Sequence, residues 1–117
     1  MTVRRPGGLL IVNADDWGGF EDGTNAILRA FQAGAITSTT AMVYMADSER
    51  AAALAGEHGL PTGLHLNLTQ PFDGEPVADA VRERQRRLCA RLWPLTVARR
   101  WLCDPRPSTN RLIRDVV

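Results

Sequence analysis

The stretch IVNADDWGG, residues 11–19, joins the end of a short apolar run to two adjacent carboxylates, Asp15 and Asp16. Trp17 and a pair of glycines follow directly. Two like charges at the end of a buried strand repel each other unless solvent or a cation lies close to both. The stretch is therefore either a solvated turn or one wall of a cation site, and the surrounding sequence has to distinguish the two.

Short apolar segments alternate with helical segments on both sides of this stretch. We predict a strand over 9–13, which is a continuous apolar run, and a second over 36–44, which is rich in β-branched residues. A third strand is predicted over 62–69, where apolar and polar residues alternate strictly. In the last of them, Leu64, Leu66 and Leu68 are expected on one face, and His65, Asn67 and Thr69 on the other.

Helices are predicted between these strands. One covers 22–35, with Asp22 or Thr24 as its cap, and the other covers 47–59, with Asp47 or Ser48 first and Gly59 last. Strands that alternate with helices over short connections are typical of parallel βαβ units. We expect an α/β fold: an incomplete (β/α)-barrel-like arrangement of three N-terminal βα units.

The pattern changes after Gln70. Residues 78–103 indicate an Arg-rich helix interrupted at Pro94, and 108–117 indicate the start of another helix. Ten of the 14 arginines lie between residues 82 and 114, and the chain has no lysine. We interpret these charges as solvated helix faces, with a nucleic-acid surface as the weaker alternative. The chain is expected to be a single partial domain over 1–117, with a core at 9–72 and the Arg-rich segment at 78–117.

Composition limits the function classes. A net charge of +1 and 44% hydrophobic residues are ordinary for a soluble globular protein, so we expect neither a nucleic-acid nor a membrane partner. The apolar run at 9–12 is too short for a signal peptide or a membrane span, which favours a cytoplasmic location. Cys89 and Cys103 have the spacing of neither a zinc framework nor a disulfide scaffold.

Active sites of parallel α/β folds collect at the carboxyl ends of the strands. The first predicted strand brings Asn13, Asp15 and Asp16 to that edge, and the third brings His65 and Asn67. A carboxylate and an imidazole suit a divalent ion such as Zn²⁺ or Mg²⁺. Only one aspartate need bind the ion, which leaves the other as a candidate general base.

The backbone has to turn for both aspartates to serve one site. Strict pleating sends Asp15 and Asp16 to opposite faces. We expect the strand to end near Ala14 and the chain to turn at Gly18 and Gly19. On local evidence alone, a turn with capping carboxylates is the commoner explanation of such a pair. A lone histidine in a leucine-flanked strand is likewise more often a packed core or edge residue.

Three motifs, NADDWG, GAITST and GLHLNLT, occur in an order and spacing that resemble one known family. The segments LLIVNADDWGGFEDGTNAILRAFQAGAITSTTAMVYM (9–45) and GLPTGLHLNLTQPF (59–72) closely resemble the YdjC-like family of carbohydrate deacetylases, which includes chitooligosaccharide deacetylases of the ChbG type and hopanoid-associated (HpnK-type) relatives. The resemblance implies a (β/α)-barrel-like fold, a divalent metal usually written as Mg²⁺, and hydrolysis of the N-acetyl group of an amino sugar.

The resemblance also implies roles for individual residues. Asp16 and His65 correspond to metal ligands, and Asp15 corresponds to the base that activates the attacking water. Candidate substrate contacts are Asn13, Trp17 and Asn67; for Trp17, the alternatives are stacking on a sugar face and covering the barrel mouth.

One departure from the family pattern matters. The family supplies a further metal-binding histidine from a downstream D-x-H-x-H segment, whereas the only histidines here are His58 and His65. We therefore expect an N-terminal fragment with an incomplete metal shell and little activity of its own. The alternative is a catalytically inactive carbohydrate-binding or interaction module. The expected partner is an N-acetylated sugar, and a homodimer is the assembly considered.

Overall fold

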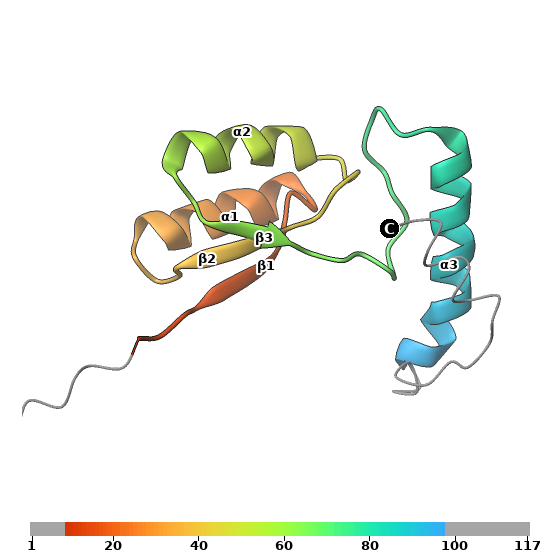
Figure 1. The fold of residues 1–117 in the computed structure, drawn as a ribbon, viewed down its shortest axis with the longest axis horizontal. Coiled ribbons are helices and arrows are strands. Elements are labelled where there is room, and N and C mark those ends of the chain that lie inside the picture. The colour runs from red at the N-terminus through yellow and green to blue at the C-terminus, as the bar shows by residue number, and fades with distance from the viewer. Residues whose placement is uncertain (1–8, 98–117) are drawn as a thin grey trace, which may run out of the picture.

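The computed structural model describes residues 9–97 (Figure 1). The elements in chain order are β1 (Asn13–Trp17), α1 (Glu21–Gln32), β2 (Ser38–Ala41), α2 (Ser48–His58), β3 (Thr62–Leu64) and α3 (Asp79–Val97). This order confirms the predicted α/β class. The predicted helix at the C-terminal end of the chain lies outside the described residues.

The three strands form one parallel sheet in the order β1-β2-β3. Helices α1 and α2 lie on the same side of it (Figure 1). Between helices and sheet is a core centred on Trp17, Ala51 and Leu60, against which apolar side chains of both helices pack. Sequential parallel strands with helices on one face are what consecutive units of a barrel wall look like, so the arrangement is consistent with part of a barrel.

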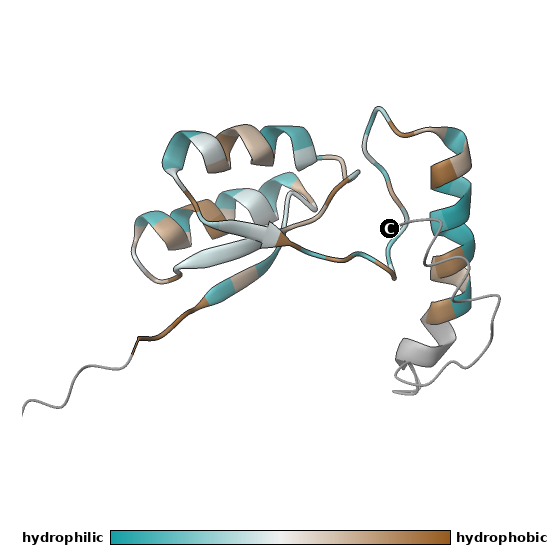
Figure 2. Cartoon of the chain, in the orientation of Figure 1, coloured by the Kyte–Doolittle hydropathy of each residue, from teal (hydrophilic) through white to brown (hydrophobic). Residues whose placement is uncertain are grey.

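The first predicted strand is displaced along the chain. β1 begins at Asn13, whereas Leu9, Leu10 and Ile11 are more than three-quarters exposed. They form the apolar segment that leaves the sheet in Figure 2. The next residue, Val12, is bound at both backbone groups: its carbonyl accepts from the amides of Thr37 and Ser38, and its amide contacts the Thr37 hydroxyl. An apolar run becomes a strand only where a neighbour pairs with it, and within residues 9–97 β2 offers none before Asn13.

The third predicted strand is shorter than its alternation indicated. β3 ends at Leu64, so most of the predicted alternation lies beyond the strand, and there Leu64 and Leu66 are exposed while Asn67 is buried. β3 is one of the two edge strands of the sheet, and within the described part of the chain the side chains of Leu64 and Leu66 stay exposed. The chain instead leaves the sheet at His65, whose amide donates the last bond to the carbonyl of Ala41.

The helix boundaries confirm some predicted caps and correct others. Asp47 is the N-cap of α2, and Gly59 ends that helix in the left-handed conformation, as expected. The N-cap of α1 is Phe20 rather than Asp22 or Thr24. Thr24 is instead fully buried, where its hydroxyl accepts from the Gly18 amide and donates to the Phe20 carbonyl.

Helix α3 runs through Pro94 without the predicted interruption. Proline costs a helix the bond of its own nitrogen, and α3 nevertheless continues past Pro94 to Val97, the last described residue. The helix is joined to the loop after β3 by two side chains one turn apart. Arg82 donates to the carbonyls of Phe72 and Gly74, and the Gln85 amide donates to those of Asn67 and Gln70.

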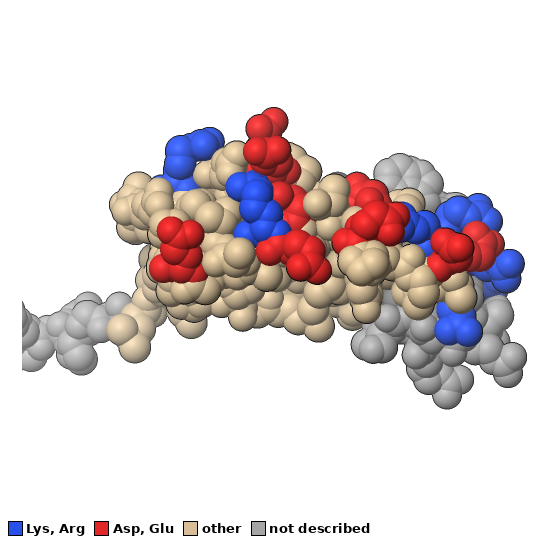
Figure 3. Space-filling view, turned by 90° about the horizontal axis from the view of Figure 1, so that it is seen from above, with Lys and Arg blue, Asp and Glu red and all other residues tan. Residues whose placement is uncertain are grey.

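The charges of α3 are partly paired along the helix itself. Glu83 binds both Arg86 and Arg87, and these hydrogen bonds lower the pKa of the Glu83 carboxyl to about 2. Figure 3 shows the arginines of α3 gathered at one end of the molecule, next to acidic side chains. None of the helices within residues 9–97 combines the length and the apolar character needed to cross a membrane.

Candidate functional site

A β-bulge brings the two adjacent aspartates to one side of the sheet. Ala14 pairs with Thr39 and Trp17 with Ala41, so two residues of β1 lie opposite the single residue Thr40 of β2. Asp16 has φ of 67°, the left-handed conformation that aspartate adopts more readily than most residues. The strand therefore continues to Trp17, so the expectation that it would end near Ala14 is wrong, whereas the expected turn at Gly18 and Gly19 is present and is closed by the bond from the Gly19 amide to the Asp16 carbonyl.

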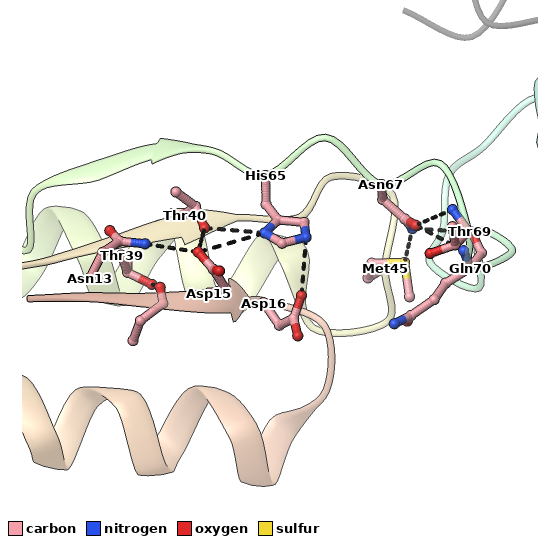
Figure 4. A network of polar contacts seen from close by, with 11 residues as sticks. Asn13, Asp15, Asp16, Thr39, Thr40, Met45, His65, Asn67, Thr69 and Gln70 are labelled. Atoms are coloured by element: carbon pink, nitrogen blue, oxygen red, sulfur yellow. Dashed lines mark hydrogen bonds and ion pairs between the residues drawn. The ribbon is translucent and has the colours of Figure 1, made fainter. Parts of the chain in front are cut away.

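Both aspartates point toward His65, which lies just after β3 (Figure 4). His65 Nε2 is 3.3 Å from Asp16 Oδ1, and His65 Nδ1 is 3.9 Å from Asp15 Oδ1. The imidazole is about 29% exposed, and both carboxylates are more than half exposed. The three residues that the sequence singled out for catalysis and metal binding thus meet at the carboxyl ends of the strands, open to solvent.

Thr40 connects two members of this group. Its hydroxyl lies 2.6 Å from Asp15 Oδ1 and 3.2 Å from His65 Nδ1. A hydroxyl has one proton, and the shorter distance is that of a charge-assisted bond, so Thr40 donates to Asp15. Its oxygen is then left to accept from an Nδ1–H of His65. We infer that the neutral imidazole carries its proton on Nδ1 and presents the Nε2 lone pair toward Asp16.

Asn13 holds Asp15 from the other side. The Asn13 amide donates to Asp15 Oδ1 at 2.8 Å, and its own oxygen accepts from the hydroxyl of Ser38. Asp15 Oδ1 thus accepts two hydrogen bonds, whereas Oδ2 accepts none from the described residues. The carboxylate is oriented by one oxygen while the other is free to take a proton. A direct substrate contact by Asn13 stays a prediction.

Trp17 and Asn67 are built into the fold. Trp17 is 1% exposed, packs beneath α2, and donates from Nε1 to the carbonyl of Ala51. Asn67 is buried: its Oδ1 accepts the amides of Thr69 and Gln70, and its Nδ2 donates to the Gln70 carbonyl. Substrate binding by either residue stays a prediction, and the contacts seen here position β1 and the loop after His65.

Two pockets flank these elements. The larger, about 570 Å³, lies between α2 and the strands, and Trp17 is the only predicted site residue among those that line it. The smaller, about 210 Å³, is lined by His65 and by aromatic and aliphatic side chains around it. We take the smaller pocket as part of the site because it adjoins the imidazole.

The donors fit a divalent ion in type and spacing. Two ligands of one ion, each about 2.0–2.1 Å from it, are roughly 3.0–3.4 Å apart. Asp16 Oδ1 and His65 Nε2, at 3.3 Å, match that separation. Within residues 9–97 there is no group of three or more His, Cys, Asp or Glu side chains arranged to hold a metal ion. The described part of the chain therefore offers a pair of ligands.

Sequence reasoning missed some residues that organise the site. Thr40 lies within the predicted strand 36–44 with no local feature that marks it, and its link between Asp15 and His65 depends on strand register. Arg82 and Gln85 were hidden in the Arg-rich segment. A polar glutamine among the apolar positions of a helix was the one signal that could have marked Gln85 as a buried contact.

The comparisons with known proteins point to one family. The model of the family described as YdjC-like protein matches residues 9–105. A human carbohydrate deacetylase is 46% identical over 80 residues, which cover 68% of this chain and 24% of the relative. A chitooligosaccharide deacetylase of Serratia marcescens is 46% identical over 70 residues, covering 59% of this chain and 26% of the relative.

A carbohydrate deacetylase of Geobacillus stearothermophilus is 49% identical over 71 residues, covering 59% of this chain and 27% of the relative. The chain thus spans about a quarter of the length of these curated relatives. No solved structure matches it significantly. The family match extends over most of the sequence and includes both aspartates and His65, so the chain belongs to the YdjC-like protein family.

Proposed function

We propose that this chain carries the N-terminal catalytic residues of a metal-dependent deacetylase that hydrolyses the N-acetyl group of an amino sugar. The observation that supports the proposal most directly is the bulge that turns Asp15 and Asp16 toward His65 on one strand-end edge. The relatives named carbohydrate and chitooligosaccharide deacetylases supply the substrate class.

In this proposal, Asp16 and His65 hold the ion, with Mg²⁺ favoured and Zn²⁺ the alternative. A bound divalent ion would polarise the acetamide carbonyl and make water a better nucleophile at neutral pH. Thr40 keeps Nε2 of His65 available as a ligand because its hydroxyl oxygen accepts a hydrogen bond from Nδ1–H. Its bond to Asp15 also fixes the distance between the base and the imidazole.

Asp15 acts as the general base. Its Oδ1 is held by Asn13 and Thr40, so the carboxylate cannot rotate without breaking two hydrogen bonds. Oδ2 is then the atom that removes a proton from the attacking water and later returns it to the leaving sugar amine. The large exposed fraction of Asp15 leaves room for both water and the acetamide group.

The test is acetate release from N-acetylglucosamine oligomers by the protein supplied with Mg²⁺ or Zn²⁺. Asp15→Asn is expected to abolish release while metal affinity, measured by calorimetry, is retained. Asp22→Asn, an exposed acid on α1, is the matched control and should behave like the wild type. Because this chain spans about a quarter of the length of its curated relatives, the assay is run on this segment joined to the remaining length of such a relative, and absence of acetate from that folded, metal-loaded protein would contradict the proposal.

A catalytically inactive carbohydrate-binding module is the second candidate. It is favoured by the ligand count, since residues 9–97 present no three-residue metal cluster. Sugar binding that is independent of added metal and unaffected by Asp16→Asn would support the binding module. Binding or acetate release that requires both metal and Asp16 would support the deacetylase.

A further inference from the structure

The small pocket beside His65 has a mainly apolar wall. Tyr44, Leu64, Leu66 and Phe72 contribute to it, together with His65 and Asn67. The amide group of Asn67 is occupied by its own loop, so the imidazole and the Tyr44 hydroxyl are the polar side-chain groups of the wall that remain to meet a ligand. The volume of the pocket, about 210 Å³, is below the roughly 300–1,000 Å³ of pockets for larger ligands. Such a pocket fits one residue of a saccharide.

Tyr44, which forms part of this wall, has an unfavourable backbone conformation. Its φ is 60°, a conformation that is uncommon for a residue with a bulky side chain. The surrounding backbone enforces it: the Gly74 amide donates to the Tyr44 carbonyl, and the Met45 amide donates to the hydroxyl of Ser48. Gly74 lies so close that a Cβ there would collide with the Met45 carbonyl.

The tyrosine ring gains little burial in return for this strain. Its side of the pocket is open, and the residue is 46% exposed. Phe72 lies behind it, 5% exposed, with the two ring centroids 5.2 Å apart and the planes inclined by 57°. The arrangement is a rigid aromatic surface, supported from below and free above, next to the imidazole of the site. Packing alone does not explain a strained tyrosine that stays half exposed.

We propose that Tyr44 is the specificity-determining surface on which the apolar face of a sugar ring rests, while the N-acetyl group of that residue lies at Asp15 and His65. The inference rests on the proposed function and names where the sugar binds. A pyranose ring presents C–H groups on one face, which suit an aromatic ring, and hydroxyls at its rim that remain in water. An acyclic N-acetylated amine has no such face and gains nothing from Tyr44.

The test compares Tyr44→Asn with wild type. Asparagine accepts the left-handed conformation, so this variant should melt no lower than the wild type while it removes the ring. Calorimetry with N-acetylglucosamine oligomers, without added metal, is expected to show affinity reduced roughly three- to tenfold. Tyr44→Phe should bind like the wild type. Phe20→Asn, which removes an exposed ring that does not line this pocket, is the matched control.

Acetate release provides a second readout. Tyr44→Asn is expected to lower kcat/KM for the oligomer by the same factor and to leave that for N-acetylethanolamine unchanged. Equal oligomer affinity in wild type and Tyr44→Asn would overturn the inference, even where acetate release upholds the deacetylase. Oligomer binding that depends on Tyr44, without any acetate release, would support Tyr44 as the sugar-binding surface and would contradict the proposed deacetylase function. A wild type that binds no oligomer would overturn the inference.

Discussion

The hydroxyl of Thr40 offers the sharpest test of how the site is organised. Thr40→Val replaces it with a methyl group of similar size and similar strand preference. The change removes the 2.6 Å bond to Asp15 and the 3.2 Å contact with His65. A hydrogen bond to a charged group contributes about 1.5–3 kcal/mol when it is buried. Because Asp15 is 65% exposed, water replaces most of that, and the loss in unfolding free energy should stay below about 1 kcal/mol.

The effect on metal binding should be larger than the effect on stability. Partners of ligating histidines fix the tautomer, and their loss typically costs 10- to 100-fold in metal affinity. We expect Thr40→Val to weaken Mg²⁺ or Zn²⁺ binding by at least about tenfold, or roughly 1.4 kcal/mol. In the metal-free protein, the population of His65 protonated on Nδ1 should fall. Calorimetric titration measures the first change, and ¹⁵N spectra of the imidazole measure the second.

Thr37→Val is the matched control, because the Thr37 hydroxyl, just before β2, bonds only the backbone of Val12, just before β1. It should leave both the tautomer and metal affinity unchanged. The spectra of the wild type and both variants should be recorded at one alkaline pH, so that neutral tautomers are compared. If Thr40→Val keeps the wild-type tautomer and metal affinity, the assigned role of Thr40 is wrong.

Three further changes test the scaffold. Arg50 lowers the pKa of the Asp47 carboxyl below 3.8, so the carboxylate stabilises the fold above that pH, and the stabilisation is lost as the pH falls through the folded-state pKa. Asp47→Asn should therefore lower the free energy of unfolding by about 1 kcal/mol at pH 7, as measured by urea unfolding, and that difference should shrink toward pH 3. Gly18→Ala should cost about 1–3 kcal/mol, because Gly18 has φ of 84° and a Cβ would press on Ala51; an unchanged melting temperature would contradict this. Gln85→Met should cost about 1–3 kcal/mol by leaving the buried Asn67 carbonyl without its donor, and hydrogen exchange should rise in the loop after His65 but not in α1.

The order of elements and the class of fold could be predicted from the sequence, because both depend on local patterns. The ends of α2 follow from local sequence: Asp47 is one of the two residues predicted for its start, and Gly59 ends it as predicted. The candidate residues Asp15, Asp16 and His65 were found because the carboxyl ends of parallel strands meet at one edge whatever the details of the strands. Each of these inferences needs only the neighbouring sequence and a general rule.

What only the tertiary structure decided depends on pairing and packing between distant segments. The bulge arises because Asp15 and Asp16 oppose one residue of β2, a register that no local pattern contains. Trp17 is buried because the pleat after the bulge turns it toward the helices. Pairing also sets the other end of β1, because residues 9–11 are apolar but have no strand partner within the described chain. The sequence alone placed the two carboxylates side by side, and pairing with β2 turned both of them toward His65.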